Sequence, residues 1–381
     1  MTRAQQEKLE AQMLAPYALK SAASRGRFHE EHEPAYRTVF QRDRDRILHT
    51  TAFRRLEYKT QVFVNHEGDY YRTRLTHTLE VAQVGESLAR ALGANRDLVE
   101  TICLSHDLGH PPFGHAGEAA LNRLMAEHGG FEHNKQTYRI VTKLERRYPT
   151  FPGLNLSYEA LEGIVKHETE YDKADAEGFS PELRASFEAQ IANIADELAY
   201  NVHDLDDGLR AGLLLPEQLA EVGLWQRLMD SLGWRDNTIT ELKRHELVRE
   251  LKGMQINDVL LHTQQLIDEH TVQTPADVQA LERNIVAHSP EMADLNREWK
   301  HFLYANMYRH YRVVRMSSKA QRFISDLFNE FVREPTQLPF QTQVRIEVVG
   351  LERAVTDYIA GMTDRYALQE WERLFGPFTR P

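Results

Sequence analysis

Residues 97–118 of the chain read DLVETICLSHDLGHPPFGHAGE. Apolar residues recur through the first half of this stretch as in a buried helix, which runs into the adjacent pair His106 and Asp107. The glycines and prolines at 109–114 then break the helix, so we expect the chain to turn and bring His110 and His115 back toward the pair. Glu118 follows directly behind. The stretch therefore concentrates groups that bind metals or transfer protons.

Two interpretations of this stretch remain open from its residues alone. Three imidazoles and a carboxylate suit a first-row divalent metal better than calcium. A single His-Asp pair is often only a hydrogen-bonded surface pair, and a second one occurs at His203-Asp204. A metal site therefore needs further ligands from elsewhere in the chain.

The composition is that of a globular protein of one large domain or two. The chain has 381 residues, of which 41% are hydrophobic and 27% charged. The sequence has no apolar run long enough for a membrane span, and the N-terminal MTRAQQEKLEAQM lacks the apolar core of a signal peptide. The single cysteine, Cys103, fits a reducing compartment. We therefore expect a cytoplasmic protein with no membrane partner.

The net charge of −11 argues against broad, charge-driven binding of nucleic acid. Positive charge is nevertheless concentrated in one early stretch, which fits either a solvated helix face or a phosphate-binding surface. Its arginines are Arg25, Arg27, Arg37, Arg42, Arg44, Arg46, Arg54 and Arg55.

Helical periodicity dominates the chain, and strand signals are few. The clearest amphipathic helix spans residues 74–92, and the stretch at 342–349 fits either a strand or the start of a helix. We expect the last helix to end near Tyr366, before an aromatic tail that includes Trp371 and Phe378. Further helices are predicted at 116–128, 134–148, 157–168, 181–203, 224–232, 242–262, 275–287 and 304–332. The fold class is therefore all-α or nearly so.

Two residues outside the stretch are candidate partners of His106 and Asp107. His77 lies on the amphipathic helix just upstream, where a histidine is more often a satisfied core residue than a ligand. Asp196 lies beside the apolar stripe of a later helix, where an unpaired carboxylate is costly and needs a cation or a donor. Tyr200 and Asp204 follow on the same helix face, which also fits a plain polar edge.

The order His, His-Asp, Asp on helices is the pattern of the HD-domain metal phosphohydrolases. The runs FRRLEYKTQVFVNHEGDYYRTRLTHTLEVA, HDLGHPPFGHAGEAAL, GGFEHNKQT, DELAYNVHDLDD and DYIAGMTDRYA make the resemblance specific. Across nearly the whole chain, the sequence resembles the deoxyguanosinetriphosphate triphosphohydrolase-like proteins. It is more distantly similar to the SAM-and-HD-domain dNTP hydrolases.

This resemblance implies a fold and a set of site residues. The fold is an HD-domain helical core with a helical C-terminal extension, divided into an arginine-containing arm (1–60), the core (61–215) and a C-terminal region that completes the site (216–381). The implied metal ligands are His77, His106, Asp107 and Asp196. The implied catalytic residues are His115 with its carboxylate partner Glu118, and His110 and His133. The implied substrate contacts are Gln61, Arg74, Lys166, Tyr200, Asp204 and Arg365.

The resemblance also implies a reaction and its partners. A dNTP would be cleaved at the α-phosphorus to a deoxynucleoside and triphosphate, with Mn²⁺ or Mg²⁺ as cofactor and Co²⁺, Ni²⁺ or Fe²⁺ as further options. Relatives form homo-oligomers, so a hexamer and a dNTP activator are expected, and single-stranded DNA is a minor expectation. Rival interpretations are an HD phosphohydrolase of other nucleotide specificity, such as a 5′-nucleotidase, and a dNTP-sensing oligomer with little hydrolysis.

Overall fold

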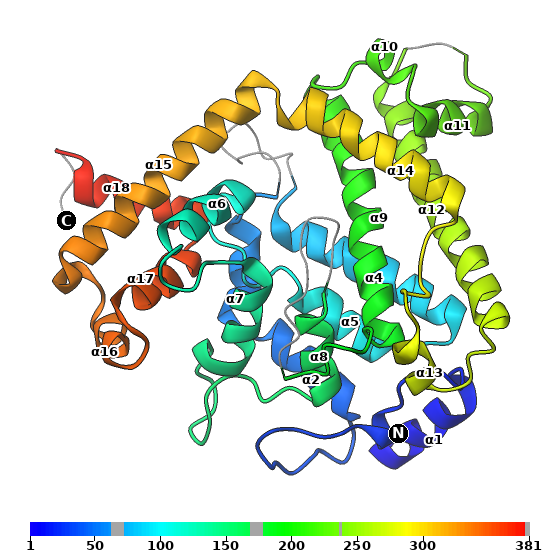
Figure 1. Ribbon diagram of the computed structural model, residues 1–381, viewed down its shortest axis with the longest axis horizontal. Helices are drawn as coiled ribbons and strands as arrows, with labels where there is room; N and C mark the ends of the chain where they lie inside the picture. The colour runs from blue at the N-terminus through cyan, green and yellow to red at the C-terminus, as the bar shows by residue number, and fades with distance from the viewer. Residues whose placement is uncertain (62–71, 168–177, 236–237, 378–381) are drawn as a thin grey trace. The chain divides into compact units, whose positions relative to one another are not determined.

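The computed structural model of the chain describes residues 1–61, 72–167, 178–235 and 238–377 (Figure 1). Within these ranges the backbone forms eighteen α-helices and no β-strand, and only isolated bridges occur outside the helices. The predicted all-α fold is confirmed. None of the described helices is both long and apolar enough to cross a membrane.

The helices, labelled as in Figure 1, are α1 (Arg3–Met13), α2 (Val39–Leu48), α3 (Thr51–Arg55), α4 (Arg74–Leu92), α5 (Arg96–Ser105), α6 (Gly114–Leu124), α7 (His133–Arg139), α8 (Tyr158–Val165), α9 (Phe187–Arg210), α10 (Pro216–Leu219), α11 (Gly223–Leu232), α12 (Glu241–Glu269), α13 (Pro275–Ala280), α14 (Pro290–Leu303), α15 (Tyr311–Arg333), α16 (Phe340–Val349), α17 (Leu351–Ala360) and α18 (Asp364–Phe375). Two π-helical turns continue α7 and α14, at Ile140–Leu144 and Tyr304–Tyr308.

The chain forms two compact units, each assembled from separate segments. The first unit comprises Met1–Arg44, Leu79–Leu104 and Ser157–Val313, and the second comprises Asp45–Thr78, Ser105–Leu156 and Val314–Pro381. Each unit draws on all three of the predicted domains, whose boundaries stay a prediction.

Helix α9 is the core helix of the first unit. It contacts α8, α12, α13 and α14. Ser186 caps its start by accepting a hydrogen bond from the amide of Ala189. The helix is buried on most of its circumference, including at the polar residues His203 and Asp204. Polar groups on α9 must therefore find partners inside the protein.

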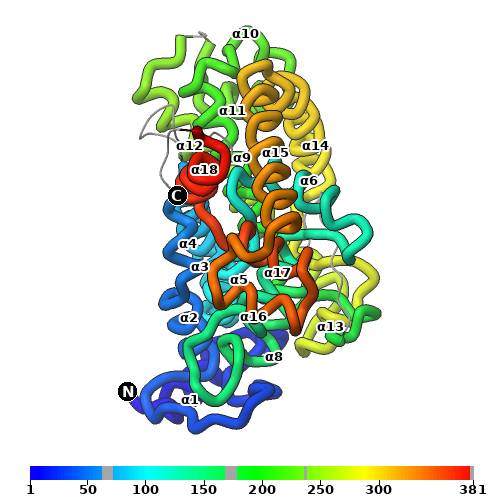
Figure 2. Tube along the Cα trace, turned by 90° about the vertical axis from the view of Figure 1, so that its left-hand side faces the viewer, coloured from blue at the N-terminus to red at the C-terminus, as the bar shows by residue number. Residues whose placement is uncertain are grey.

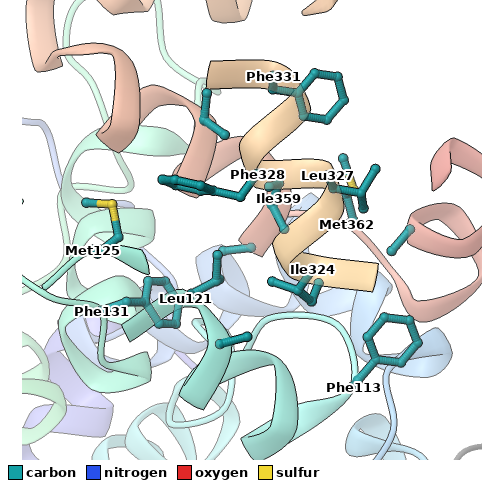
Figure 3. Close-up of a cluster of buried hydrophobic side chains, with 14 of the residues drawn as sticks. Phe113, Leu121, Met125, Phe131, Ile324, Leu327, Phe328, Phe331, Ile359 and Met362 are labelled. Carbon is teal, nitrogen blue, oxygen red and sulfur yellow. The ribbon is translucent and has the colours of Figure 1, made fainter. Parts of the chain in front are cut away.

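The second unit packs α6 against the C-terminal helices. Its core combines Phe113, Leu121 and Met125 with side chains of α15 and α17, among them Phe328 and Ile359. Figure 3 shows the side chains of α15 directed toward those of α6 and α17. The helices from α15 to α18 are drawn from orange to red in Figure 2. This core fixes the start of α6, on which candidate catalytic residues lie.

Several predicted element boundaries are wrong. The last helix continues to Phe375, because Trp371 packs against Phe323 and donates a hydrogen bond to Asp326. The predicted helix at 304–332 is interrupted, since the π-turn ends at Tyr308 and α15 starts at Tyr311. The ambiguous stretch at 342–349 belongs to helix α16. Phe378 of the predicted tail lies outside the described residues.

Candidate active site

Three of the four predicted metal ligands lie together in the second unit. His77 is in the first turn of α4, and His106 and Asp107 directly follow the end of α5. All three are buried, and one ligand atom of each lies within 4.8 Å of the others. The imidazole rings of His77 and His106 have centroids 5.5 Å apart. The fold thus brings the start of α4 close to the His106-Asp107 pair, although the two are separated in the sequence.

The charges around Asp107 keep its carboxylate ionised. Burial raises the pKa of Asp107, but Arg74, His106 and His110 outweigh burial and hold this pKa well below its usual range. Asp107 Oδ1 accepts a hydrogen bond of 2.8 Å from Arg74 and lies 3.1 Å from His110 Nε2. Asp107 Oδ2 is buried and has no hydrogen-bond partner among the described residues. A buried anionic oxygen of this kind is costly unless a cation meets it.

The donor set fits a divalent metal. Two imidazoles and one carboxylate are ligands that first-row divalent ions accept, and the open Oδ2 of Asp107 supplies a further reason for a cation there. His77, His106 and Asp107 would hold the ion. The fourth predicted ligand, Asp196, belongs to α9 of the first unit, where its Oδ2 lies 3.6 Å from Nε2 of the buried His167. Its place beside the other three stays a prediction.

Glycines make the turn after the dipeptide possible. A Cβ on Gly109 would lie 2.0 Å from the carbonyl oxygen of His133 and 2.4 Å from the amide nitrogen of Thr137. Gly117 likewise allows the carbonyl oxygen of Pro112 to approach within 2.0 Å of the position that a Cβ would take. The backbone at the start of α7 can therefore contact the turn that follows the His106-Asp107 pair. This contact brings His133 close to that turn.

A second polar group forms around Glu118. Glu118 Oε2 lies 3.2 Å from His115 Nδ1, and Oε1 accepts from the His133 amide at 2.8 Å and lies 2.9 Å from His133 Nδ1. Burial raises the pKa of Glu118, but hydrogen bonds with His115 and His133 outweigh it and hold the pKa far below its usual range. An ionised Glu118 thus orients two imidazoles through their Nδ1 atoms.

His110 and His133 stack face to face, with ring centroids 3.9 Å apart and planes at 20°. Their ligand atoms and that of Glu118 lie close enough for a second metal ion. Nitrogen lone pairs lie in the plane of each ring, so those of stacked rings run side by side rather than converging on one ion. Burial, Arg74 and His133 lower the pKa of His110 well below its usual range. We therefore interpret this pair as hydrogen-bonding groups and not as a second metal site.

Buried polar atoms without partners surround these residues. Arg74 gives one nitrogen to Asp107, while its Nε and Nη2 find no hydrogen-bond partner among the described residues. The same holds for His110 Nδ1 and for Gln61 Oε1. Because buried polar groups are normally satisfied, these atoms indicate a polar ligand. Arg365, also predicted to contact substrate, is exposed and stacks over Tyr58 at 5.0 Å.

The remaining predicted substrate contacts belong to the first unit. Lys166 is buried, forms a 2.9 Å ion pair with Glu162 and donates to the carbonyl of Arg184. Its charge is therefore already partnered within the unit. Tyr200 and Asp204 lie together on α9, as their spacing predicts.

The structure adds a residue that the sequence did not reveal. The hydroxyl of Tyr308 donates to Asp204 Oδ2 and lies 2.9 Å from the Tyr200 hydroxyl. Burial, Asp204 and Tyr200 raise the pKa of Tyr308 well above its usual range, so it remains a donor. Tyr308 lies on a π-turn, 108 residues along the chain from Tyr200 and 104 from Asp204. No local spacing in the sequence could indicate that contact.

Much of the early arginine cluster is used inside the protein. Arg27 pairs with Glu33 and Asp43, and Arg42 with Glu31 and Glu33. Arg44 pairs with Asp97 and Glu100, and Arg46 donates to the carbonyls of Leu154 and Asn155. These four arginines stabilise the fold, which neither interpretation of the cluster anticipated.

Comparisons with known proteins show which families the chain matches. The HD domain family matches residues 74–201, and the phosphohydrolase-associated domain family matches residues 286–373. A deoxyguanosinetriphosphate triphosphohydrolase-like protein of Geobacter sulfurreducens is 52% identical, over 98% of this chain and 97% of its own. Proteins of the same description from Geobacter metallireducens and Thiobacillus denitrificans are each 51% identical, over 96% and 95% of this chain and 96% and 97% of their own.

Proposed function

The chain belongs to the family of deoxyguanosinetriphosphate triphosphohydrolase-like proteins, which are HD-domain hydrolases, and we propose that it hydrolyses deoxynucleoside triphosphates at the α-phosphorus. Water adds its oxygen to that phosphorus, the bond to the 5′-oxygen breaks, and the products are a deoxynucleoside and inorganic triphosphate. The main support is the pair of buried, unpartnered donor atoms of Arg74, Nε and Nη2, beside the metal-ligand cluster.

Arg74 suits a phosphate group. The Arg74 guanidinium is 1% exposed, so its two unpartnered donors would meet an anion in a weakly screened environment. His110 is neutral and gives its Nε2 hydrogen to the ionised Asp107, so its unpartnered Nδ1 is an acceptor that suits a hydroxyl or a water molecule rather than a phosphate oxygen. A divalent metal at His77, His106 and Asp107 would supply positive charge to the phosphate oxygens. Holding the phosphates in place is the larger part of catalysis in phosphoryl transfer.

His115 is the proposed proton donor to the leaving 5′-oxygen. Its side chain is 57% exposed and so accessible to substrate, while its Nδ1 is held by Glu118. With Nδ1 occupied, Nε2 faces outward and carries the proton to be transferred. Glu118 is anchored in turn by the amide of His133. Glu118, anchored by His133, would therefore position His115; the family resemblance implied Glu118 alone as the partner of His115.

The preference for a deoxy sugar is assigned to the first unit. Tyr200 would leave no room for a 2′-oxygen, and Asp204 would accept a hydrogen bond from the 3′-hydroxyl. Tyr308 fixes both side chains at once, and we add it to the proposed sugar-binding residues. Gln61, Lys166, Arg365 and the ligand Asp196 remain part of the proposal.

The family basis extends the proposal to assembly and location. We propose a cytoplasmic homo-oligomer, a hexamer by resemblance, in which a second dNTP activates hydrolysis. Light scattering of the purified protein with and without dNTPs tests the assembly. A species of constant monomeric mass would contradict it.

Product analysis tests the reaction. The protein is given each dNTP alone and all four together, with Mn²⁺ or Mg²⁺, and phosphorus products are resolved by ³¹P NMR. Triphosphate is the expected product, and activity only in the mixture would indicate an activator site. Release of pyrophosphate or single phosphate would point to another HD phosphohydrolase activity. Tight dNTP binding without turnover would favour the dNTP sensor instead.

A further inference from the structure

A buried polar network in the second unit is not used by the proposed chemistry. Lys59, Thr60 and Asp364 are at most 7% exposed. Lys59 Nζ donates to the carbonyl of His110 and, at 3.0 Å, to the carbonyl of Ala360. Asp364 Oδ2 accepts from the amide and the hydroxyl of Thr60. Lys59 is thereby joined to the last residue of α17, and Thr60 to the first residue of α18.

The same network contacts the turn between the HD dipeptide and α6. Asp364 Oδ1 accepts a hydrogen bond of 2.8 Å from the amide of Phe113, and Lys59 binds the turn at His110. Phe113 has a φ of 65°, which is costly for a residue with a side chain. Phe113 immediately precedes α6, and no side chain of its own caps that helix. The hydrogen bond from the Phe113 amide to Asp364 therefore helps to hold the helix start in this conformation from outside the turn.

The orientation of α6 determines where the side chains of its first turn lie. His115 and Glu118 both lie in the first five residues of this helix. A rotation of the Phe113 amide would swing both side chains together, without touching the metal ligands His77 and His106. Buried cations are costly, and among the described residues Lys59 donates hydrogen bonds to two carbonyls and to no carboxylate. An apolar side chain would fill that space at lower cost, so the hydrogen bonds to the turn give Lys59 a reason to be there.

We propose that Lys59 and Asp364 are positioning residues that fix the turn at His110–Phe113 from the α17–α18 junction, and so aim His115 at its target. The inference rests on the proposed function of His115. It makes the C-terminal helices part of the catalytic apparatus. The α17–α18 junction then acts at the turn through these two side chains.

Asp364→Asn tests the inference with minimal change of shape. An amide offers one acceptor oxygen and one NH₂ group, so one of the amide donors from Thr60 and Phe113 must lose its acceptor. We expect kcat for dNTP hydrolysis to fall at least tenfold, with KM within about twofold and the metal content unchanged. Hydrogen exchange should accelerate in peptides covering 106–118. Lys59→Met, which removes both hydrogen bonds of the ammonium group, should act in the same direction.

Asp326→Asn is the matched control. Asp326 lies in the same C-terminal segment and accepts a hydrogen bond from Trp371, but among the described residues it forms no hydrogen bond or ion pair with the turn. This variant should keep wild-type kcat and wild-type exchange at 106–118. An equal loss of kcat in Asp326→Asn, or a loss in Asp364→Asn explained by the unfolded fraction at the assay temperature, would reduce Asp364 to a structural role and overturn the inference.

The outcomes separate this inference from the proposed function. If the wild-type protein hydrolyses dNTPs and both Asp364→Asn and Lys59→Met retain full kcat, only the positioning role is wrong. If the wild-type protein hydrolyses no dNTP, the proposed function fails and the catalytic role of the junction fails with it. Faster exchange at 106–118 together with a kcat loss at constant KM would establish the positioning role.

Discussion

At the scale of single residues, Asp107 has the strongest physical requirement for a metal ion. Asp107→Asn removes the negative charge while keeping the shape of the side chain. We expect the metal bound per protein, measured by elemental analysis, to fall. The rate of hydrolysis should fall with it, by at least about 10²-fold. Asp230→Asn, at an exposed pair with Arg235, should change neither quantity. Full metal content in Asp107→Asn would contradict the assignment of this ligand.

His115 should separate catalysis from metal binding. His115→Ala removes the proposed proton donor but no predicted ligand, so metal content should stay at the wild-type value. Turnover should fall by roughly 10²–10⁴-fold, the usual contribution of a general acid. His128→Ala, another exposed histidine of the second unit, provides the control. Loss of the metal in His115→Ala would show that the two roles were divided wrongly.

Tyr308 should affect sugar recognition. Tyr308→Phe keeps the ring and removes the hydroxyl that reaches Asp204 and Tyr200. Loss of a hydrogen bond to a charged group costs about 1.5–3 kcal/mol, so kcat/KM for a dNTP should fall roughly 10- to 100-fold, and discrimination against the ribonucleotide should weaken. Tyr304→Phe, at an exposed neighbour, is the control. Unchanged kcat/KM for both sugars would remove Tyr308 from the proposed site.

The sequence predicted the chemical role of single side chains better than it predicted which residues contact one another. His77, His106 and Asp107 carry metal-binding groups in a motif, and the structure brings them together. Tyr308 carries an ordinary side chain whose role comes only from its distant partners. Arg27 shows the opposite case, because an arginine in a basic run turned out to be buried against Asp43 and Glu33.

At the scale of elements, the close contact between α7 and the dipeptide turn depends on Gly109. Gly109→Ala would place a Cβ against backbone atoms of His133 and Thr137, which cannot rotate away. We expect the free energy of unfolding to fall by about 1–3 kcal/mol, measured by denaturant titration. Gly253→Ala is the matched control, because that Cβ would meet nothing within 4 Å in the middle of α12. It should instead stabilise by about 0.5–1 kcal/mol. A stable Gly109→Ala would contradict the described packing.

Helix existence followed from periodicity, while helix ends did not. The 74–92 prediction coincides with α4, because its apolar spacing is regular and the chain breaks just after Leu92. The end of α18 was misplaced because the residues beyond Tyr366 are held by a tertiary contact of Trp371 with Asp326. The break before α15 falls at a π-turn, and no proline or glycine marks it in the sequence.

At the scale of the whole molecule, the two compact units could not be predicted from the sequence. Each unit combines three segments separated by other parts of the chain. Helical periodicity identifies the face that each helix buries, but it does not identify the partner that covers it. The three predicted domains were continuous stretches of the chain. The compact units are not continuous, because each is formed by contacts between segments that are distant in the sequence.

A buried carboxyl in the first unit should make global stability depend on pH. Glu188, on α9, accepts hydrogen bonds from the amides of Leu19 and Asn95, and burial raises the pKa of Glu188 from 4.5 to about 7. The folded state therefore favours the protonated form. This contribution is complete below pH 4.5 and is lost as pH rises through about 7, amounting to about 3 kcal/mol.

Glu188→Gln tests this dependence. The amide oxygen can accept the same two hydrogen bonds and does not ionise. The variant should therefore melt at a higher temperature than the wild type at pH 8, and the difference should shrink at pH 5. A melting-temperature difference that is equal at both pH values would contradict the pKa of Glu188.

The origin of the oxygen in the product tests the central claim most directly. Hydrolysis of a dNTP with Mn²⁺ in H₂¹⁸O is followed by mass spectrometry of both products. Attack of water on the α-phosphorus predicts one ¹⁸O atom in inorganic triphosphate and none in the deoxynucleoside. Label in the deoxynucleoside, or release of labelled pyrophosphate or phosphate in place of triphosphate, would contradict the proposed reaction.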